Sequence, residues 1–253
     1  MILDVSGVGF GYRGQEVLSD VTFSVSEGET VSVLGPNGVG KTTLLKCIDS
    51  ILRPDSGSVT VDGRDVCSMG RSEIAKVIGY VPQRAHVSGS TVFESVMIGR
   101  KPHIGIDIPE RDLRLVGRVL EVMGLSGISG KPVNGISGGE YQLVQIARAL
   151  VQQPRVILMD EPTSSLDLRN QYRVLDAVTH IVRENGMCAV MTNHDLNQAL
   201  RFSDRFVLMR GGRVFASGGR EVITSENIRL VYGMDAEVTE IGGRPVVVPL
   251  EAL

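Results

Sequence analysis

The stretch LGPNGVGKTT (34–43) decides how this chain folds. Its glycines, lysine and threonine follow the spacing G-x-x-x-x-G-K-[ST], in which successive backbone N–H groups turn inward and cradle phosphates. The residues TVSVL (30–34) before it are expected to form a strand. Residues 42–52 after it are expected to form a helix with an apolar face made by Leu44, Leu45, Ile48 and Leu52. A chance glycine turn lacks this strand-and-helix setting, so we interpret the stretch as a phosphate-binding loop.

The side chains of this loop predict a site for ATP and Mg²⁺. We expect Lys41 to reach the β- and γ-phosphates and the Thr42 hydroxyl to hold Mg²⁺. The residues expected to contact the nucleotide are Gly35, Pro36, Asn37, Gly38, Gly40, Lys41, Thr42 and Thr43.

A second acidic segment, RVILMDEPTSSLD (155–167), completes this site. Residues 156–159 are apolar and predict a buried strand that ends on two carboxylates. Asp160, at the carboxyl end of that strand, is expected to help hold the metal, and Glu161 to orient or deprotonate the attacking water. A strand that simply ends in solvated acids is the alternative, and the phosphate loop upstream makes it the weaker one.

Three single polar residues fit the same site with less support. Gln83 follows a predicted strand and is expected to touch the metal or the water, although an isolated Gln is more often a surface residue. His194 follows the strand MCAVMT (187–192) and is expected to contact the γ-phosphate. Tyr12 is expected to stack on a base, although a lone Tyr is more often part of a core.

Composition narrows the class of protein. The 253 residues carry a net charge of −3, which argues against a nucleic-acid binder. The three cysteines form no CxxC pair, so a disulfide framework or a zinc site is not expected. Because no signal peptide or membrane-spanning run is recognisable, any link to a membrane is expected to come through a partner.

The order of patterns predicts an α/β fold. The first 83 residues read mainly as strands, and Asp62 and Gly63 form a hairpin turn between two of them. Helices separated by Gly/Pro breaks follow over 84–153. Strands and helices then alternate over 154–220, which is typical of a parallel sheet covered by helices. Residues 221–253 predict a short helix and a β ribbon, to which we assign no role.

The segment ISGGEYQLVQIARAL (136–150) is the most informative. Leu143, Ile146, Ala147 and Leu150 form one buried helical face. Ser137 and Glu140 have capping-box spacing, which explains them as a helix start, but two glycines behind a cap weaken the helix. The two glycines are explained if another group must approach the backbone closely at this helix start. Because the first loop already serves this chain's nucleotide, we expect this helix start to serve the nucleotide of a partner chain.

These segments together resemble the ATP-binding cassette family, over nearly the whole chain. GPNGVGKTT (35–43) is similar to its phosphate loop, ISGGE (136–140) to its signature, VILMDEP (156–162) to its metal strand and SSLD (164–167) to its D-loop. The resemblance implies a P-loop NTPase (RecA-like) core with an N-terminal antiparallel β subdomain, over 1–83 and 154–220. It also implies an inserted helical subdomain over 84–153 and a C-terminal extension over 221–253.

The resemblance also implies roles for single residues. It makes Gln83 a Q-loop residue, His194 the switch histidine and Tyr12 the aromatic that stacks on adenine. It adds nucleotide contacts across a homodimer, which are Ser137, Gly138, Gly139, Glu140 and Asp167. Ile136, Glu140 and Ser165 depart from the family's usual leucine, glutamine and alanine, and none of these changes removes a catalytic group.

The stretch TVFESVMIGRKPH (91–103) is similar to importer ATPases for iron–siderophore complexes, haem and cobalamin and, in some members, molybdate or tungstate. The resemblance implies an energy-coupling ATPase at the cytoplasmic face of the cell membrane. Its partners would be a homodimer mate, two integral membrane permease subunits and a substrate-binding protein, with no nucleic acid. The permease surface is expected within 83–103, and charge reversal at Arg100 and Lys101 is expected to reduce transport while sparing basal ATP hydrolysis.

Two other classes were weighed. A non-transport member, such as an iron–sulfur assembly ATPase, stays open, and the importer-like stretch after Gln83 argues against it. A GTP-binding switch needs a guanine-specificity element such as NKxD, which the sequence lacks.

Overall fold

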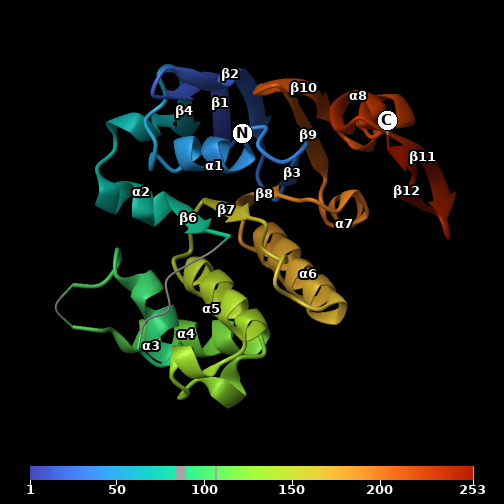
Figure 1. Ribbon diagram of the computed structural model, residues 1–253. Coiled ribbons are helices and arrows are strands. Elements are labelled where there is room, and N and C mark those ends of the chain that lie inside the picture. The colour runs from blue at the N-terminus through green and yellow to red at the C-terminus, as the bar shows by residue number, and fades with distance from the viewer. Residues whose placement is uncertain (84–88, 106, 253) are drawn as a thin grey trace.

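The computed structural model describes residues 1–83, 89–105 and 107–252 (Figure 1). Arg84, with which the helical segment was expected to begin, lies outside the described residues. The strands are β1 (Leu3–Tyr12), β2 (Gln15–Val25), β3 (Thr30–Leu34), β4 (Ser56–Val61), β5 (Arg64–Asp65), β6 (Ile78–Val81), β7 (Val156–Asp160), β8 (Cys188–Thr192), β9 (Arg205–Arg210), β10 (Arg213–Gly218), β11 (Met234–Ile241) and β12 (Arg244–Ala252). The α-helices are α1 (Lys41–Ile48), α2 (Arg71–Val77), α3 (Val92–Met97), α4 (Glu110–Val122), α5 (Gly138–Leu150), α6 (Leu168–Glu184), α7 (Leu196–Phe202) and α8 (Ser225–Tyr232).

A parallel sheet forms the centre of the molecule, in the order β10-β9-β3-β8-β7-β6. Its neighbouring strands run parallel except at one edge, where β10 pairs antiparallel with β9. The strands β3, β7 and β8 are buried along their whole length, as expected for a sheet covered on both faces. The α/β class predicted from the sequence is confirmed.

A separate antiparallel sheet, β2-β1-β4-β5, packs over one face of the parallel sheet. The strands β4 and β5 are joined by Asp62 and Gly63, at φ 48° and 75°. Two positive φ values in sequence are what a tight hairpin turn requires, so this turn was predicted correctly.

Helix α1 lies between the two sheets, and Leu44, Leu45 and Ile48 are fully buried there. The helix is shorter than the expected 42–52, because it ends at Ile48 and Ser50 adopts a left-handed conformation at φ 54°. Pro54 also disfavours helical backbone at the residue before it. Leu52 therefore lies beyond the helix, although it still packs against the same core.

Strand β7 joins two hydrophobic cores. Val156 and Leu158 pack toward α1 and the antiparallel sheet, whereas Ile157 and Met159 pack toward the helices on the other face. This alternation follows from the two-residue period of a strand. The end of β7 is thus held from both sides.

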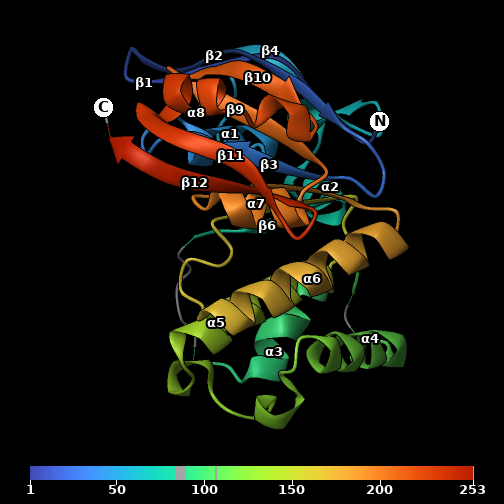
Figure 2. The ribbon, with the colours of Figure 1, turned by 90° about the vertical axis from the view of Figure 1, so that its right-hand side faces the viewer.

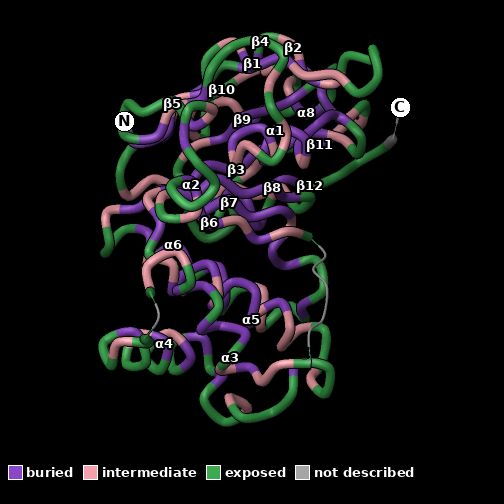
Figure 3. Tube along the Cα trace, turned by 90° about the vertical axis from the view of Figure 1, so that its left-hand side faces the viewer, coloured by how far each residue is buried: buried purple, intermediate pink, exposed green. Residues whose placement is uncertain are grey.

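The helices α3, α4 and α5 form a group on one side of the parallel sheet (Figures 1 and 2), where α5 packs against β6 and α6 against β8. They enclose the second core, in which Val116, Leu120, Ile146 and Ala147 are buried. The expected apolar face of α5 is confirmed, with Leu143 only partly buried. Figure 3 shows exposed residues in the loops of this group, whereas the inner strands β3, β7 and β8 of the parallel sheet are buried.

The C-terminal residues form α8 and the β11–β12 hairpin, as predicted. They complete a third core, in which Ile228, Val231 and Val247 contact Leu34, Phe206 and Leu208 of the parallel sheet. Across the described residues, no helix is both long enough and apolar enough to cross a bilayer.

Candidate nucleotide site

The loop between β3 and α1 adopts a conformation that only glycine accommodates easily. Gly40 has a φ of 108°, and a Cβ there would lie 2.8 Å from Leu18 Cδ2 and 3.2 Å from the Val17 carbonyl oxygen. Gly35, at φ 150°, is equally restricted, since a Cβ would lie 2.6 Å from the Met209 carbonyl oxygen. Gly38 has a φ of 79° with no atom within 4 Å of a built Cβ, so this part of the loop opens to solvent.

Lys41 lies inside this loop. Its Nζ donates hydrogen bonds to the carbonyl oxygens of Gly35 at 2.7 Å and Pro36 at 3.1 Å. Only 6% of the residue is exposed. Burial lowers the pKa of Lys41, and the carboxylates of Glu161 and Asp160 oppose that shift. The loop therefore holds a lysine side chain at its centre, at the start of α1, and a helix start with a cation beside it suits a phosphate group.

Asp160 and Thr42 bring oxygen atoms together beside the loop. The Thr42 hydroxyl donates to Asp160 Oδ2 at 2.8 Å, although the two residues lie far apart in the sequence. Asp160 is 2% exposed, at the carboxyl end of β7. Mg²⁺ prefers hydroxyl and carboxylate oxygens and keeps several waters, so this pair suits it. Within the described part of the chain, no cluster of three or more His, Cys, Asp or Glu side chains offers a metal site.

Glu161 contacts the two polar residues expected beside it. Gln83 Nε2 donates to Glu161 Oε2 at 2.5 Å, and His194 Nε2 is in contact with Glu161 Oε1. The Glu161 side chain is 14% exposed, and its backbone has a φ of 50°. A left-handed conformation is uncommon for a residue other than glycine, and it turns the chain sharply after β7. The structure therefore brings Gln83, Glu161 and His194 together.

Tyr12 lies at the end of β1, 46% exposed, with its ring edge-on to Phe10 at 4.9 Å between ring centres. Its strand partner is Gln15, which lines a cavity of about 450 Å³ beside the phosphate loop. The other lining residues are Glu16, Val17, Ser19, Pro36, Asn37, Gly38, Val39, Gly211 and Gly212. An exposed aromatic ring next to this cavity is available for stacking, and its role stays a prediction.

The helix start at Ser137 forms the predicted capping box. Ser137 Oγ accepts a hydrogen bond from the Glu140 backbone N–H at 3.2 Å, and Glu140 Oε2 accepts one from the Ser137 backbone N–H at 2.8 Å. The hydrogen bond from the Ser137 backbone is the main reason why the pKa of Glu140 is lowered. Ser137 and Gly138 are exposed, in the group of helices that lies away from α1 (Figure 2). The described residues show no hydrogen bond between Ser137 and this chain's phosphate loop.

The two glycines of this segment differ in what surrounds them. A Cβ on Gly138 would meet no atom within 4 Å, whereas one on Gly139 would lie 3.3 Å from Leu166 Cδ2. Gly139 thus packs against the loop that leads to Asp167. Asp167 caps α6, because its Oδ1 accepts from the Asn170 backbone N–H at 2.9 Å. The space beside Gly138 remains open to a partner.

Two residues at this site were not singled out from the sequence. The Thr192 hydroxyl donates to Asp160 Oδ1 at 2.8 Å and accepts from the Glu161 backbone N–H at 2.9 Å. The sequence pattern that could have indicated Thr192 is a threonine at the end of a strand that is expected to lie beside β7. Tyr232 of α8 is partly buried near the Gly35 backbone, and desolvation of its hydroxyl raises its pKa to about 12. No sequence pattern indicates this contact.

The expectation that Arg100 belongs to the docking surface is wrong. Arg100 is 6% exposed, and its Nε donates to Asp112 Oδ1 at 2.6 Å. Its Nη1 also donates to the Val151 carbonyl oxygen at 2.8 Å. A guanidinium with a carboxylate and a carbonyl partner can be buried, so this residue ties the segment after α3 to α4 and the end of α5. Lys101 is exposed.

Comparison with known proteins agrees with this geometry. The family model described as ABC transporter matches residues 18–164. An uncharacterised ABC transporter ATP-binding protein of Methanocaldococcus jannaschii is 47% identical, over 99% of this chain and 98% of its own. The iron(3+)-hydroxamate import ATP-binding protein of Bacillus subtilis is 35% identical, over 93% of this chain and 89% of its own. Among solved structures, an inward-facing transporter described as of the metal-chelate type matches with a TM-score of 0.84 and 28% identity, covering 100% of this chain and 98% of its own.

Proposed function

The chain belongs to the ABC transporter family of ATP-binding proteins, and from this premise we propose that it powers the import of a metal chelate such as an iron–siderophore complex, haem or cobalamin. It has the P-loop core and the ATPase activity of that family. One observation carries the proposal: Asp160 and Glu161 meet Thr42, Gln83 and His194 beside the phosphate loop. The metal-chelate substrate is supported by the iron(3+)-hydroxamate relative and by the metal-chelate type transporter of similar structure.

In this proposal the loop around Lys41 holds the β- and γ-phosphates of ATP. Thr42 and Asp160 supply the oxygen atoms for Mg²⁺, which when bound draws negative charge from the phosphate oxygens. Tyr12 stacks on the base, and the remaining loop residues donate backbone hydrogen bonds. Because Lys41 is desolvated, its charge interacts more strongly with a phosphate than it would in water.

Glu161 positions the attacking water. Its carboxylate is largely shielded and is held at both oxygens by Gln83 and His194. A carboxylate fixed in this way can accept a proton from a water that lies in line with the γ-phosphate. In this structure, Gln83 and His194 contact that carboxylate. When ATP binds, their side chains are placed to contact the water, the metal or the γ-phosphate instead.

The second half of each ATP site comes from a partner chain. Ser137 and Gly138 present an exposed helix start, which is a site for a negatively charged phosphate group. Leu168, just after Asp167, is 70% exposed and is therefore accessible to a partner chain. A homodimer in which the signature segment of one chain faces the phosphate loop of the other uses both features.

A groove of about 360 Å³ is suited to the membrane subunits. It lies between α2, β6 and the segments that follow α1 and α5, and its lining includes Ile51, Ile74, Tyr80 and Gln152. Ile51 is 54% exposed there. The groove lies where the sheet meets the helical segment expected over 84–153. A partner bound in it would therefore move when the helical segment moves relative to the sheet. Part of the expected docking stretch, residues 84–88, lies outside the described residues.

The assembly that follows has a homodimer of this chain at the cytoplasmic face of the cell membrane. Two integral membrane permease subunits lie above it, and a substrate-binding protein delivers the chelate on the far side. No nucleic acid takes part.

The test is purification of the complex from membranes, followed by reconstitution in vesicles that enclose ATP. We expect co-purification of permease subunits and ATP-dependent uptake of an iron–siderophore complex, haem or cobalamin. Uptake is expected to vanish with Glu161→Gln, while assembly of the complex persists. Uptake of molybdate or tungstate alone would replace the metal-chelate assignment. Isolation with iron–sulfur assembly proteins and without permeases would overturn the transport proposal.

A further inference from the structure

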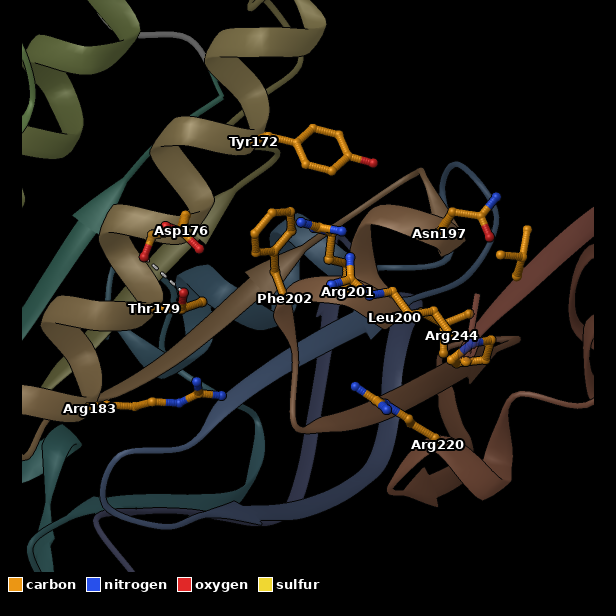
Figure 4. A pocket seen from close by; sticks show the side chains of 13 residues that line it. Tyr172, Asp176, Thr179, Arg183, Asn197, Leu200, Arg201, Phe202, Arg220 and Arg244 are labelled. Carbon is orange, nitrogen blue, oxygen red and sulfur yellow. Dashed lines mark hydrogen bonds between the residues drawn. The ribbon is translucent and has the colours of Figure 1, made fainter. Parts of the chain in front are cut away.

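A second cavity, of about 680 Å³, is lined by residues from the second half of the chain (Figure 4). Its walls come from α6, α7, the 3₁₀ turn η5 (Arg220–Val222) and the β11–β12 hairpin. It shares no lining residue with the nucleotide site described above. We call it the arginine groove.

Four arginines from four separate segments line this groove, which are Arg183, Arg201, Arg220 and Arg244. Figure 4 shows the side chains of Arg183 and Arg220 extending toward each other from opposite sides. Asp176 is the one carboxylate among the described lining residues. The groove therefore has an excess of positive charge, although the chain as a whole carries a net charge of −3.

Most of this charge has no partner in the protein. Arg183 is paired, because its Nη2 donates to Asp204 Oδ1 at 2.8 Å. In the described part of the chain, Arg201, Arg220 and Arg244 form no ion pair and no side-chain hydrogen bond. Guanidinium groups that outnumber the carboxylates beside them repel one another, and an anion that binds between them lowers that repulsion.

One guanidinium is already positioned by aromatic rings. Arg201 lies over the ring of Tyr172 at 5.0 Å and over that of Phe202 at 5.6 Å. Both rings belong to the groove, and stacking restricts the guanidinium without using its N–H donors. The flat donor edge of Arg201 therefore remains available for two oxygens of a phosphate.

The hairpin wall is held in place by a pair of hydrogen bonds. Asn197 Nδ2 donates to the Val247 carbonyl oxygen at 3.0 Å, and the Val247 backbone N–H donates to Asn197 Oδ1 at 2.7 Å. Arg244 lies three residues before Val247 on the same strand. The groove is thus a fixed concave site, and its volume lies within the range of sites for small ligands.

We propose that the arginine groove binds a soluble molecule that bears two or more phosphate groups, and that this binding changes the rate of ATP hydrolysis. Four guanidinium groups attract a multiply charged anion more strongly than a singly charged one, and each can bind two oxygens of a phosphate group. A concave site walled by four segments suits a molecule that enters it better than it suits the surface of a lipid bilayer. The C-terminal residues 221–253 thereby gain a role as one wall of a regulatory site.

The link to hydrolysis follows from where α6 and α7 begin. Helix α7 starts two residues after His194, and α6 starts directly after Asp167. Both helices are tied to the loop after Glu161, because Thr163 Oγ1 donates to Gln198 Oε1 at 2.8 Å and Gln198 Nε2 donates to Gln171 Oε1 at 3.2 Å. Gln171 in turn donates to the Thr163 carbonyl oxygen at 3.2 Å. A ligand that draws α6 and α7 together acts on the catalytic loop through this network.

Tripolyphosphate is the probe for a direct binding experiment. Calorimetric titration is done on the complete chain with saturating ADP and Mg²⁺, so that the nucleotide site is filled. We expect one further tripolyphosphate per chain. Arg220→Gln/Arg244→Gln is expected to weaken its binding by about tenfold or more, since two charge-assisted contacts are lost. The control Arg111→Gln/Arg114→Gln removes the same charge from the exposed face of α4 and is expected to leave affinity within about twofold.

The same variants test the regulatory effect. At saturating ATP and constant free Mg²⁺, tripolyphosphate is expected to change kcat by about twofold or more in the wild-type chain and in the control, but not in the groove variant. Absence of the further binding event, or equal weakening in both variants, would overturn the site. Binding without any change in kcat would overturn the regulatory effect. Groove-dependent flotation with phosphatidylglycerol vesicles, without tripolyphosphate binding, would overturn the soluble ligand in favour of a lipid.

Discussion

Thr192→Val is the sharpest test of how the catalytic carboxylates are held. The Thr192 hydroxyl donates to Asp160 Oδ1 and accepts from the Glu161 backbone N–H, each within 2.9 Å, and the residue is fully buried. Valine keeps the volume and the β-branched shape at the end of β8, so the substitution removes the hydroxyl and little else.

The energetic cost follows from the two lost contacts. A hydrogen bond to a carboxylate contributes about 1.5–3 kcal/mol, and a buried N–H left without an acceptor costs about 1–3 kcal/mol. Because the two effects share one hydroxyl and are not additive, we expect the free energy of unfolding to fall by about 2–4 kcal/mol. We expect kcat to fall by about tenfold to a hundredfold, because both carboxylates lose the group that fixes their positions, while the affinity for ATP changes little.

Urea unfolding measures the stability, and steady-state ATP hydrolysis with nucleotide titration measures kcat and affinity. Thr179→Val is the matched control, since the Thr179 hydroxyl donates only to the Asp176 carbonyl oxygen within α6, at 3.0 Å. It is expected to cost about 1 kcal/mol and to leave kcat unchanged. A Thr192→Val protein with stability within 0.5 kcal/mol and kcat within about twofold of wild type would refute the argument.

Four further predictions concern other parts of the molecule. Glu161→Gln should retain ATP binding, lower hydrolysis by about a hundredfold or more and trap an ATP-bound dimer in size-exclusion chromatography; hydrolysis within a few fold of wild type would place the base elsewhere. Ser137→Arg should block hydrolysis while the monomer still binds nucleotide. Ser137→Ala should only lower the free energy of unfolding, by about 1 kcal/mol, through the lost helix cap. Loss of nucleotide binding by the Arg variant would argue against a site shared between chains. Arg100→Gln should lower the free energy of unfolding by about 3–5 kcal/mol, because the buried Asp112 loses its ion pair with Arg100. Arg100→Met/Asp112→Leu should recover much of that loss. A cost below about 1 kcal/mol for Arg100→Gln would show that the pair is not buried in solution. Burial raises the pKa of Asp49 from 3.8 to about 7, so the folded protein keeps a proton that the unfolded chain releases, and the contribution of this residue to stability should fall as the pH rises from 4 to 7. Asp49→Asn should flatten that part of the profile, and an unchanged slope would contradict the shift.

The sequence was sufficient for the elements whose patterns are local. The apolar run 156–159 and the alternation of strands and helices predicted β7 and the parallel sheet, because buried parallel strands need continuous apolar residues. The helix α6 falls within the alternating segment 154–220. The capping box at Ser137 was also readable, since its hydrogen bonds join residues only three apart.

Contacts between distant segments were harder to predict. Nothing in the stretch 99–103 indicates that Arg100 turns inward, because its partner Asp112 lies on a later helix and becomes a partner only through packing. The arginine groove was invisible for the same reason, as its four cations come from segments spread over some sixty residues. The position of Thr192 could have been predicted from the sequence. Parallel strands end at the same edge of a sheet, so the last residue of β8 is expected near Asp160.

The contact between Gly139 and Leu166 has a consequence for a dimer. In the proposed dimer, Gly139 belongs to one composite ATP site, together with the partner's phosphate loop, whereas Leu166 follows Glu161 in the other. A shift of the loop after Glu161 at one site therefore displaces the helix start that serves the other. The two ATP molecules of such a dimer do not act independently, and cooperativity between them is a property of the packing within each single chain.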